Sequence, residues 1–204
     1  MTSETLLLET LNKEKKVKQK AQQEGISKNF SWVLFFAGEE YNQELAQQEI
    51  PEKNIIDFAQ VGQGKGEWIE TKIKEIYQDS KNQQAIAAHN FPIIWFKNIE
   101  KITSQELEHS LLPIFDHQQN TNLFGEAIDL SNYILIATSS TRNMGQLSLP
   151  LVSRLECVNV DTAQPKKFFL DKYFSWILAG TVLLIITFLL LIFWPGKKDS
   201  KRKI

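Results

Sequence analysis

Trp32–Phe36 reads WVLFF, an apolar run without a break, and four further apolar runs follow it along the chain. They are NIIDFA at 54–59, FPIIWF at 91–96, YILIAT at 133–138 and a shorter run at 155–160. Strands that are apolar at successive positions are buried on both faces, as in a parallel sheet covered by helices. The sequence therefore predicts five parallel strands.

The segments between these runs carry helical patterns. A polar stretch at about 42–49 follows the first strand, and apolar residues recur at helical spacing along 66–78. Thr103 and Glu106 have the spacing of a capping box at the start of a helix that runs to about residue 115. Strands that alternate with helices predict an α/β fold in which helices flank the sheet.

The first 25 residues are polar and rich in lysine, and they predict one charged helix over 2–24 that ends at Gly25. Thr2 or Ser3 is placed to cap it, and leucines at 7, 8 and 11 form a short apolar stripe. We interpret this segment as a solvated helix, with a partner-binding arm as the alternative. The α/β domain is then expected over 30–163.

Charge divides the chain into two parts. Residues 1–165 hold 15 Lys and Arg against 22 Asp and Glu, whereas residues 166–204 hold 8 against 2. An acidic body argues against nucleic acid as a partner, because phosphate neutralisation needs a basic face. A single cysteine, Cys157, and three scattered histidines make no zinc signature, so neither a metal nor another cofactor is expected.

Residues 173–194 read YFSWILAGTVLLIITFLLLIFW and contain no charged side chain. A helix of this length spans ~33 Å, enough to cross a hydrocarbon core of ~30 Å. The basic tail 195–204 follows, so lipid is the expected partner and a single-pass membrane anchor is predicted. No hydrophobic export signal precedes the body, which predicts that it lies in the cytoplasm. The basic tail favours the opposite orientation by the positive-inside rule.

Ligands of parallel sheets bind beyond the carboxyl ends of the strands, so the turn after the first strand is the first candidate site. A phosphate-binding loop there reads G-x-x-x-x-G-K-[ST], with glycines that expose amides and a lysine for the terminal phosphates. Gly38 supplies the first glycine, but Gln43 and Glu44 occupy the positions of the second glycine and the lysine. Nearby carboxylates would also repel a triphosphate, so no nucleotide is expected to bind here in the usual way.

The second candidate is the end of the third strand, where a nucleotide hydrolase carries carboxylates for Mg²⁺ and for water activation. Lys97 and Asn98 stand there instead, and neither can do that chemistry. The glycines at 62, 64 and 66 lack the spacing of a dinucleotide-binding motif, and we interpret them as a turn. Asp116-His117 and the run at 139–141 suggest a hydrolase only weakly, because no nucleophile motif accompanies them.

LLPIFDHQQNTNLFGEAIDLSNYILIATSS, at 111–140, resembles the AAA+ ATPase module of Lon-type proteases. That family has Leu-Leu-x-x-Leu-Asp-Pro-x-Gln-Asn, a phenylalanine, Asp-Leu-Ser and a strand ending in Ala-Thr-Ala-Asn, followed by Pro-Leu-x-x-Arg-x-Glu. The matching positions are Leu111, Leu112, Asp116, Gln119, Asn120, Phe124, Asp129, Leu130, Ser131, Ala137, Thr138, Pro150, Leu151, Arg154 and Glu156. The resemblance covers about 90–160 by motif and 30–90 by strand order alone.

The resemblance implies an AAA+ or P-loop-like sheet whose nucleotide machinery is degenerate. Walker A then falls at Gly38–Leu45, Walker B at Lys97-Asn98, and Ser140 replaces the sensor asparagine. Arg154 matches the arginine finger that acts on a neighbouring subunit's nucleotide, although a salt-bridged structural role is the alternative. The family continues into a helical lid and a protease domain, whereas this chain runs from residue 160 into the apolar segment.

These observations predict a catalytically inactive, membrane-anchored AAA+-like protein that acts as a scaffold or as a regulatory subunit. Its expected partners are membrane lipid and another protein, of which an active AAA+ ATPase is one candidate. Two alternatives stay open. One is an unconventional ATPase that uses a displaced loop such as 63–66 or is completed by a partner subunit, and the other is a purely structural membrane protein.

Overall fold

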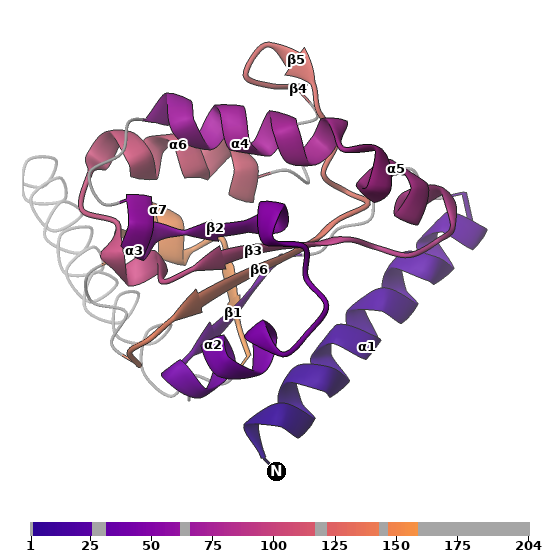
Figure 1. Ribbon diagram of the computed structural model, residues 1–204, viewed down its shortest axis with the longest axis horizontal. Helices are drawn as coiled ribbons and strands as arrows, with labels where there is room; N and C mark the ends of the chain where they lie inside the picture. Colours follow the sequence, from indigo (N-terminus) through magenta and orange to yellow (C-terminus); the bar gives the residue numbers. More distant parts are fainter. Residues whose placement is uncertain (1, 26–31, 62–65, 117–121, 143–146, 159–204) are drawn as a thin grey trace, which may run out of the picture. The chain divides into compact units, whose positions relative to one another are not determined.

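Five parallel strands form the central sheet of the protein, as the apolar runs predict (Figure 1). In the computed structural model they are β1 (Val33–Ala37), β2 (Ile55–Asp57), β3 (Ile93–Lys97), β6 (Ile134–Ser139) and β7 (Leu155–Cys157). Their order across the sheet is β2-β3-β6-β1-β7. Every neighbouring pair is parallel, which confirms the predicted α/β class and the five-stranded parallel sheet.

The structure describes residues 2–25, 32–61, 66–116, 122–142 and 147–158. These belong to one compact unit, Met1–Val160, and the second unit, Asp161–Ile204, lies outside the described residues together with the predicted span at 173–194 and the tail at 195–204. Within the described ranges, no helix is both long and apolar enough to cross a membrane.

Residues on opposite sides of each strand enter two separate hydrophobic cores, because successive side chains of a strand point to opposite faces. In β1, for example, Phe35 belongs to one core and Phe36 to the other, and neither is exposed. All five residues of β1 and all six of β6 are buried. The unbroken apolar runs of the sequence follow directly from this burial on both faces.

The larger core lies between the sheet and the helices α4 (Gly66–Gln78), α6 (Gln105–Phe115) and α7 (Leu149–Val152). α4 has the bounds that the sequence predicts, and its three isoleucines, Ile69, Ile73 and Ile76, are fully buried in this core. The first turn of α6 differs from the prediction. Ser104, rather than Thr103, caps the helix by accepting a hydrogen bond from the Leu107 amide at 3.4 Å.

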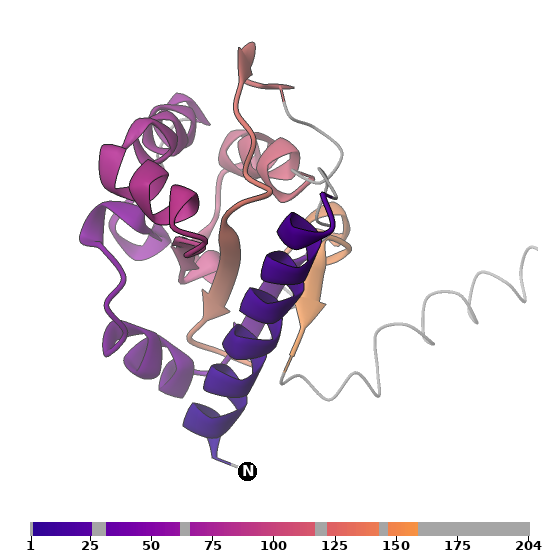
Figure 2. The ribbon, with the colours of Figure 1, turned by 90° about the vertical axis from the view of Figure 1, so that its right-hand side faces the viewer.

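Two helices cover the opposite face, α1 (Ser3–Gln23) and α2 (Glu39–Ala46). Figures 1 and 2 show α1, in indigo, running along the side of the sheet that α4 and α6 do not cover. Thr2 caps α1 and Gly25 follows its end at a φ of +66°, as expected from the sequence. The interpretation of α1 as a solvated helix was wrong, because its leucine stripe is needed to cover this face of the sheet: Leu7 is fully buried there and Leu11 is 4% exposed.

Polar contacts hold α1 at both ends. Near its start, the Ser3 hydroxyl donates to the carboxylate of Glu44 in α2. Near its end, the Lys18 ammonium donates to the Ser131 carbonyl at 2.7 Å, and the Gln22 amide donates to Asn132 at 3.2 Å. Burial lowers the pKa of Lys18 from 10.5 to about 8, although Glu14 and Asp129 oppose the shift. α1 is therefore fixed to the domain along its whole length.

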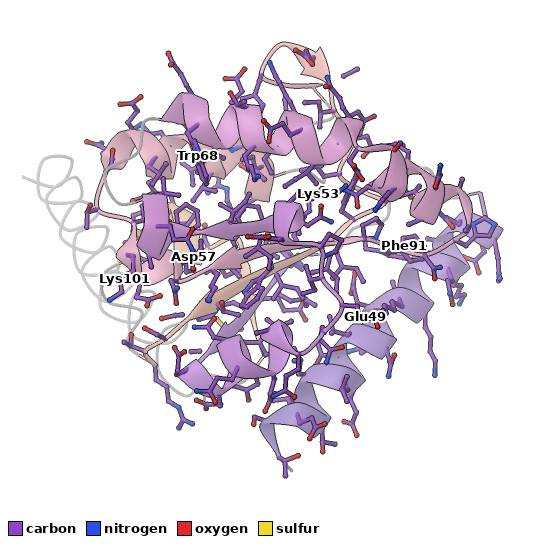
Figure 3. All side chains as sticks on the ribbon, viewed as in Figure 1. Glu49, Lys53, Asp57, Trp68, Phe91 and Lys101 are labelled. Carbon is purple, nitrogen blue, oxygen red and sulfur yellow. The ribbon has the colours of Figure 1, made fainter. Side chains whose placement is uncertain are left out.

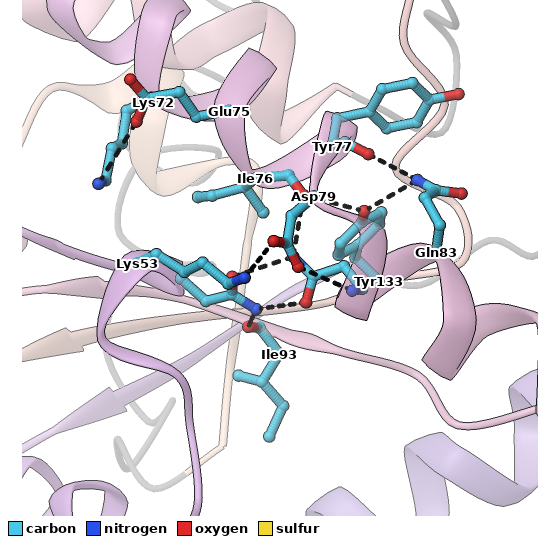
Figure 4. Close-up of polar contacts among 11 residues, drawn as sticks. Lys53, Lys72, Glu75, Ile76, Tyr77, Asp79, Gln83, Ile93 and Tyr133 are labelled. Carbon is cyan, nitrogen blue, oxygen red and sulfur yellow. Dashed lines mark hydrogen bonds and ion pairs between the residues drawn. The ribbon is translucent and has the colours of Figure 1, made fainter.

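The remaining elements are short, and the sequence did not predict most of them. They are α3 (Phe58–Val61), α5 (Ser80–Ala87), the 3-10 helices η1 (Glu52–Asn54) and η2 (Ile99–Lys101), and an antiparallel hairpin of β4 (Asn122–Leu123) and β5 (Glu126–Ala127). Side-chain amides anchor α5. Asn54 and Asn82, both buried, exchange two hydrogen bonds at 3.1 and 3.0 Å, and Lys53 pairs with Asp79 beside them (Figure 4).

Candidate functional site

A crevice for ligands is expected where neighbouring parallel strands send their next helices to opposite faces of the sheet. β1 and β6 are such a pair, with Phe35 beside Ala137 in the register. α2 follows β1 and packs on one face, whereas α7 follows β6 and packs on the other. The carboxyl ends of β1 and β6 are therefore the position in this fold at which a nucleotide would be expected.

No loop separates β1 from α2 at this position. β1 ends at Ala37, and α2 begins at Glu39, three residues earlier than the sequence predicts. Gly38 alone makes the turn, with a φ of +134° that side-chain-bearing residues rarely adopt, and its amide donates to the Ser139 carbonyl at 2.8 Å. A phosphate-binding loop needs several residues of exposed amides between strand and helix, and here that length is absent.

The amino terminus of α2 already holds a carboxylate. A side chain added at Gly38 would collide with the carboxylate of Glu40, which bends back over the first turn of the helix. Its own backbone amide and, secondarily, Arg142 lower the pKa of Glu40, and Arg142 lies 3.1 Å from its Oε1. A helix amino terminus attracts anions, so Glu40 occupies the place in which a phosphate would be favoured.

A chain of buried side-chain hydrogen bonds fills the edge of the sheet beside this turn. The Trp95 indole donates to the Thr138 hydroxyl at 2.8 Å, and this hydroxyl donates to the Asn42 amide oxygen at 2.5 Å. The Asn42 nitrogen donates to Asn98 at 3.0 Å, and Asn98 donates to Asp57 at 2.8 Å. Asn42 is 2% exposed and Thr138 is not exposed, so the crevice between β1 and β6 is closed by the protein's own amides.

Asn98, at the position of the expected Walker B carboxylate, joins the end of β3 to β2 and α2. It has a φ of +58° and is 9% exposed, so the left-handed turn after β3 aims its amide inward. Asparagine tolerates this conformation better than most residues. Its oxygen accepts from α2 and its nitrogen donates toward the end of β2, which is the arrangement of a structural crosslink rather than of a general base.

Lys97 lies at the border of this cluster. Its ammonium is 3.6 Å from Asp57 and 5.4 Å from the ring centroid of Trp95. Figure 3 shows Asp57 at the carboxyl end of β2, on the same side of the sheet as Lys101. A cation therefore neutralises the carboxylate that ends β2. Within the described ranges, no group of three or more His, Cys, Asp and Glu side chains is placed to hold a metal ion.

Glu100 is a buried carboxylate that the sequence interpretation missed. It is 5% exposed, and its Oε1 accepts from the amide and the hydroxyl of Ser140 at 3.2 and 2.5 Å. Its Oε2 has no hydrogen-bond partner. Ser140, at the expected sensor position, therefore fixes the turn after β6 to η2. No sequence pattern singled out Glu100, since it lies two residues beyond the Walker B position.

Gln43 and Glu44, at the positions expected for the second glycine and the lysine of a phosphate-binding loop, point away from the crevice. Gln43 is exposed. Glu44 accepts a hydrogen bond from Ser3 at the start of α1, and its second oxygen is buried without a partner. Gln43 and Glu44 thus do not join the cluster of Asn42 and Asn98, even though they follow Asn42 directly in the sequence. Helical periodicity separates them, because adjacent residues of a helix face different directions.

Arg154 lies in the turn between α7 and β7 and is held within its own chain. Its Nη2 is 2.7 Å from the Asp116 carboxylate at the end of α6, and its Nη1 donates to the Pro150 carbonyl at 2.6 Å. Its Nε is buried without a partner. About a quarter of the side chain is exposed. In this arrangement the guanidinium supports the contact of α6 with α7.

The residues that suggested a hydrolase or a glycine-rich loop either form turns or lie outside the described residues. Ser139 and Thr141 hydrogen-bond to each other across the turn after β6. Gly66 begins α4 where a side chain would collide with Ser110, so this glycine allows α4 to approach α6 closely. Residues 62–65 and His117 lie outside the described residues, so the displaced-loop alternative is untested.

Comparison of the sequence with known protein families and with curated proteins gave no match.

Proposed function

We propose that this chain is a catalytically inactive, membrane-anchored AAA+-like protein that works by binding, as a scaffold or as a regulatory subunit of a membrane-associated complex. The observation that carries the proposal is the closed crevice. Asn42 in α2 is hydrogen-bonded both to Thr138 near the carboxyl end of β6 and to Asn98 directly after β3. A nucleotide would have to break this buried chain in order to enter.

The placement of the Lon-like motif residues on described elements supports the AAA+ part of the proposal. Ala137 and Thr138 lie in β6 of the parallel sheet, and Pro150 and Leu151 lie in α7. Asp116 of the motif at 111–120 and Arg154 of the motif at 150–156 form an ion pair, so the two motifs also pack together.

Three features argue that the ancestral chemistry is lost rather than displaced nearby. α2 begins one residue after the turn glycine, Glu40 neutralises the helix terminus, and Lys97 neutralises Asp57. Each removes a different requirement: exposed amides, a site for anions, and a carboxylate free to bind Mg²⁺. Restoring one of them alone would leave the other two absent.

Thermal unfolding of the full chain in detergent, with and without Mg-ATP, tests the inactive site. Ligand present at 100 times its Kd stabilises the folded state by about 2.7 kcal/mol, which for a domain of this size raises the Tm by roughly 5–10 °C. We expect no shift with Mg-ATP and no release of phosphate. A shift of that size, or phosphate release above that of a denatured sample, would contradict the proposal.

Alkaline carbonate extraction tests the anchor. The full chain is expected to stay with the membrane pellet, because residues 173–194 carry no charge. The matched variant replaces Leu184 and Ile185 by Arg, each of which costs about 2.5–3.5 kcal/mol at the centre of a span. This variant should move to the supernatant. Release of the unmodified chain would refute the membrane anchor and would not affect the proposal of an inactive site.

Crosslinking in cells followed by purification of the intact chain tests the regulatory role. Stoichiometric recovery of an active AAA+ ATPase supports a subunit of that ATPase, and the Arg154→Ala variant then separates two functions for Arg154. A fall in the partner's turnover without a loss of this chain's stability indicates an arginine finger. Recovery of other proteins without any ATPase supports the scaffold.

A further inference from the structure

Three lysines lie in a row on the outer side of α1. Lys13, Lys16 and Lys20 are exposed, and their spacing of three and four residues puts them on one face of the helix. This lysine face is opposite to the buried face of Leu7, Leu11, Lys18 and Ala21, which packs on the sheet and its loops. Because α1 is fixed on the domain, the lysine face is fixed too.

The lysine face contrasts with the domain that carries it. Residues 13–20 hold five lysines and one glutamate, whereas residues 1–165 as a whole hold 15 Lys and Arg against 22 Asp and Glu. Among the described residues, Lys20 is the one member of the face with an ion pair, a 3.7 Å contact with Glu24 in which the Lys20 side chain is 74% exposed. Glu9, one turn before Lys13, is exposed on the same side of the helix, so from Glu9 to Glu24 this face holds three lysines and two carboxylates and keeps a net positive charge.

We propose that the lysine face of α1 binds the anionic headgroups of the membrane in which the chain is anchored. The inference rests on the membrane anchor of the proposed function. Each lysine near an anionic bilayer strengthens binding about fivefold, so three lysines give at most roughly a hundredfold, and Glu9 and Glu24 on the same side reduce this. That is too weak to recruit a free protein, but an anchor in the same membrane makes the contact intramolecular and raises the effective lipid concentration.

A short link would keep the domain near the predicted anchor. Residues 159–172 join the last described strand to the apolar segment, and an extended chain of that length reaches at most about 50 Å. Nucleic acid is the rival ligand for a basic helix. The anionic membrane is favoured because the rest of the domain is acidic and would repel a long polyanion that extends beyond α1.

The test uses the full chain in lipid nanodiscs. Amine labelling rates of individual lysines are measured by mass spectrometry in nanodiscs of phosphatidylcholine and in nanodiscs with about one third phosphatidylserine. Lys15, Lys81 and Lys101 are internal controls, since they are exposed but lie outside the lysine face. We expect labelling of the lysine face to fall at least about fivefold with phosphatidylserine at about 0.1 M salt, and to recover at about 0.5 M.

A photoactivatable phosphatidylserine gives an independent readout. The unmodified chain should crosslink through α1. Crosslinking should fall at least about fivefold in the variant K13Q/K16Q/K20Q and persist in the matched variant K15Q/K81Q/K101Q, which removes the same charge elsewhere. Gln is as good a helix former as Lys, so both variants keep α1.

Three outcomes overturn the inference. Equal labelling in both lipids, or an equal fall at the control lysines, means that the lysine face does not select the anionic surface. Protection by a DNA duplex in phosphatidylcholine nanodiscs assigns the face to nucleic acid. Failure of the chain to enter nanodiscs at all refutes the anchor first and the docking with it, so the two failures are distinguished.

Discussion

The side-chain amide of Asn42 donates a hydrogen bond to the side-chain oxygen of Asn98 at 3.0 Å, and this contact joins the helix after β1 to the turn after β3. Both residues are nearly inaccessible to solvent. In a nucleotide hydrolase of this topology, the same two turns face each other across the bound phosphates. Here the two turns are joined directly by a hydrogen bond between buried side-chain amides.

Replacing Asn42 by Ala should destabilise the domain. The substitution leaves the Thr138 hydroxyl without its acceptor and the Asn98 oxygen without its donor, and each unsatisfied buried group costs about 1–3 kcal/mol. We expect a loss of about 2–4 kcal/mol in urea unfolding of the full chain, followed by tryptophan fluorescence. The exposed neighbour gives the control, since Gln43→Ala should stay within about 0.5 kcal/mol of the unmodified chain. An Asn42 variant as stable as this control would refute the crosslink.

Gly38→Ala should also destabilise the chain, for two reasons that act together. The φ of +134° is strained for alanine, and the new methyl group collides with the Glu40 carboxylate. Such backbone strain costs about 1–3 kcal/mol, and the displaced carboxylate adds to it. Gly25→Ala is the control, because Gly25 also has a positive φ but faces open space. Equal losses for the two variants would show that Glu40 does not fill the turn.

Because of Lys18, the free energy of unfolding should increase as the pH rises. Its pKa is about 8 in the folded chain, against 10.5 when it is exposed. Between these two values the unfolded state binds the proton and the folded state releases it, so the free energy of unfolding increases with pH. The increase should reach about 3 kcal/mol by the upper end of this window. Below the folded pKa both states hold the proton, so Lys18 contributes no pH dependence there.

The Lys18→Met variant isolates this effect from the titration of other groups. Unfolding free energies of both chains are measured in urea at pH values inside and below the window. The difference in unfolding free energy between the two chains should change across the window by most of the increase of about 3 kcal/mol expected for Lys18. Parallel pH profiles for the variant and the unmodified chain would mean that Lys18 keeps its ordinary pKa despite its burial.

Arg154 and Asp116 should be energetically coupled. Their contact of 2.7 Å is partly shielded, with about a quarter and a third of the two side chains exposed. A double-mutant cycle to Ala should give a coupling energy of about 1 kcal/mol. The Glu40–Arg142 pair is the matched comparison, since Arg142 is 79% exposed, and its coupling should stay below about 0.5 kcal/mol. A coupling energy near zero would contradict a structural role for the Arg154–Asp116 ion pair and would favour an action of Arg154 on another subunit.

Most strands and the longest helices could be predicted from local pattern. WVLFF and YILIAT mark strands because both faces of a parallel sheet exclude water, and 66–78 marks a helix because its isoleucines return to one side. The start of α2 could not be predicted in this way. Glu39 and Glu40 are polar and carry no periodic signal, and only the turn at Gly38 brings them into the helix.

The sequence predicts where the candidate-site residues lie along the strands, but not which residues they contact. The sequence alone indicates that Lys97 and Asn98 end a strand and lack catalytic carboxylates. It does not indicate that Asn98 meets Asn42, 56 residues away, or that buried Glu100 holds Ser140. Asn42 was overlooked because nothing separates a buried asparagine from a solvated one in a polar stretch. Such pairings depend on which helix covers which face of the sheet.

Local sequence patterns are enough to predict the α/β class and the five strands, because burial of neighbouring side chains requires unbroken apolar runs in the strands and helical spacing of apolar residues in the helices. They also show that Lys97 and Asn98 follow the third strand, where a nucleotide hydrolase would carry carboxylates. Tertiary structure alone decided that α1 belongs to the core, that Glu40 fills the helix terminus and that Asn42, Thr138 and Asn98 close the crevice. Hydrogen bonds between distant residues form only after the strands have brought them together, so their specificity is absent from any single segment of the chain.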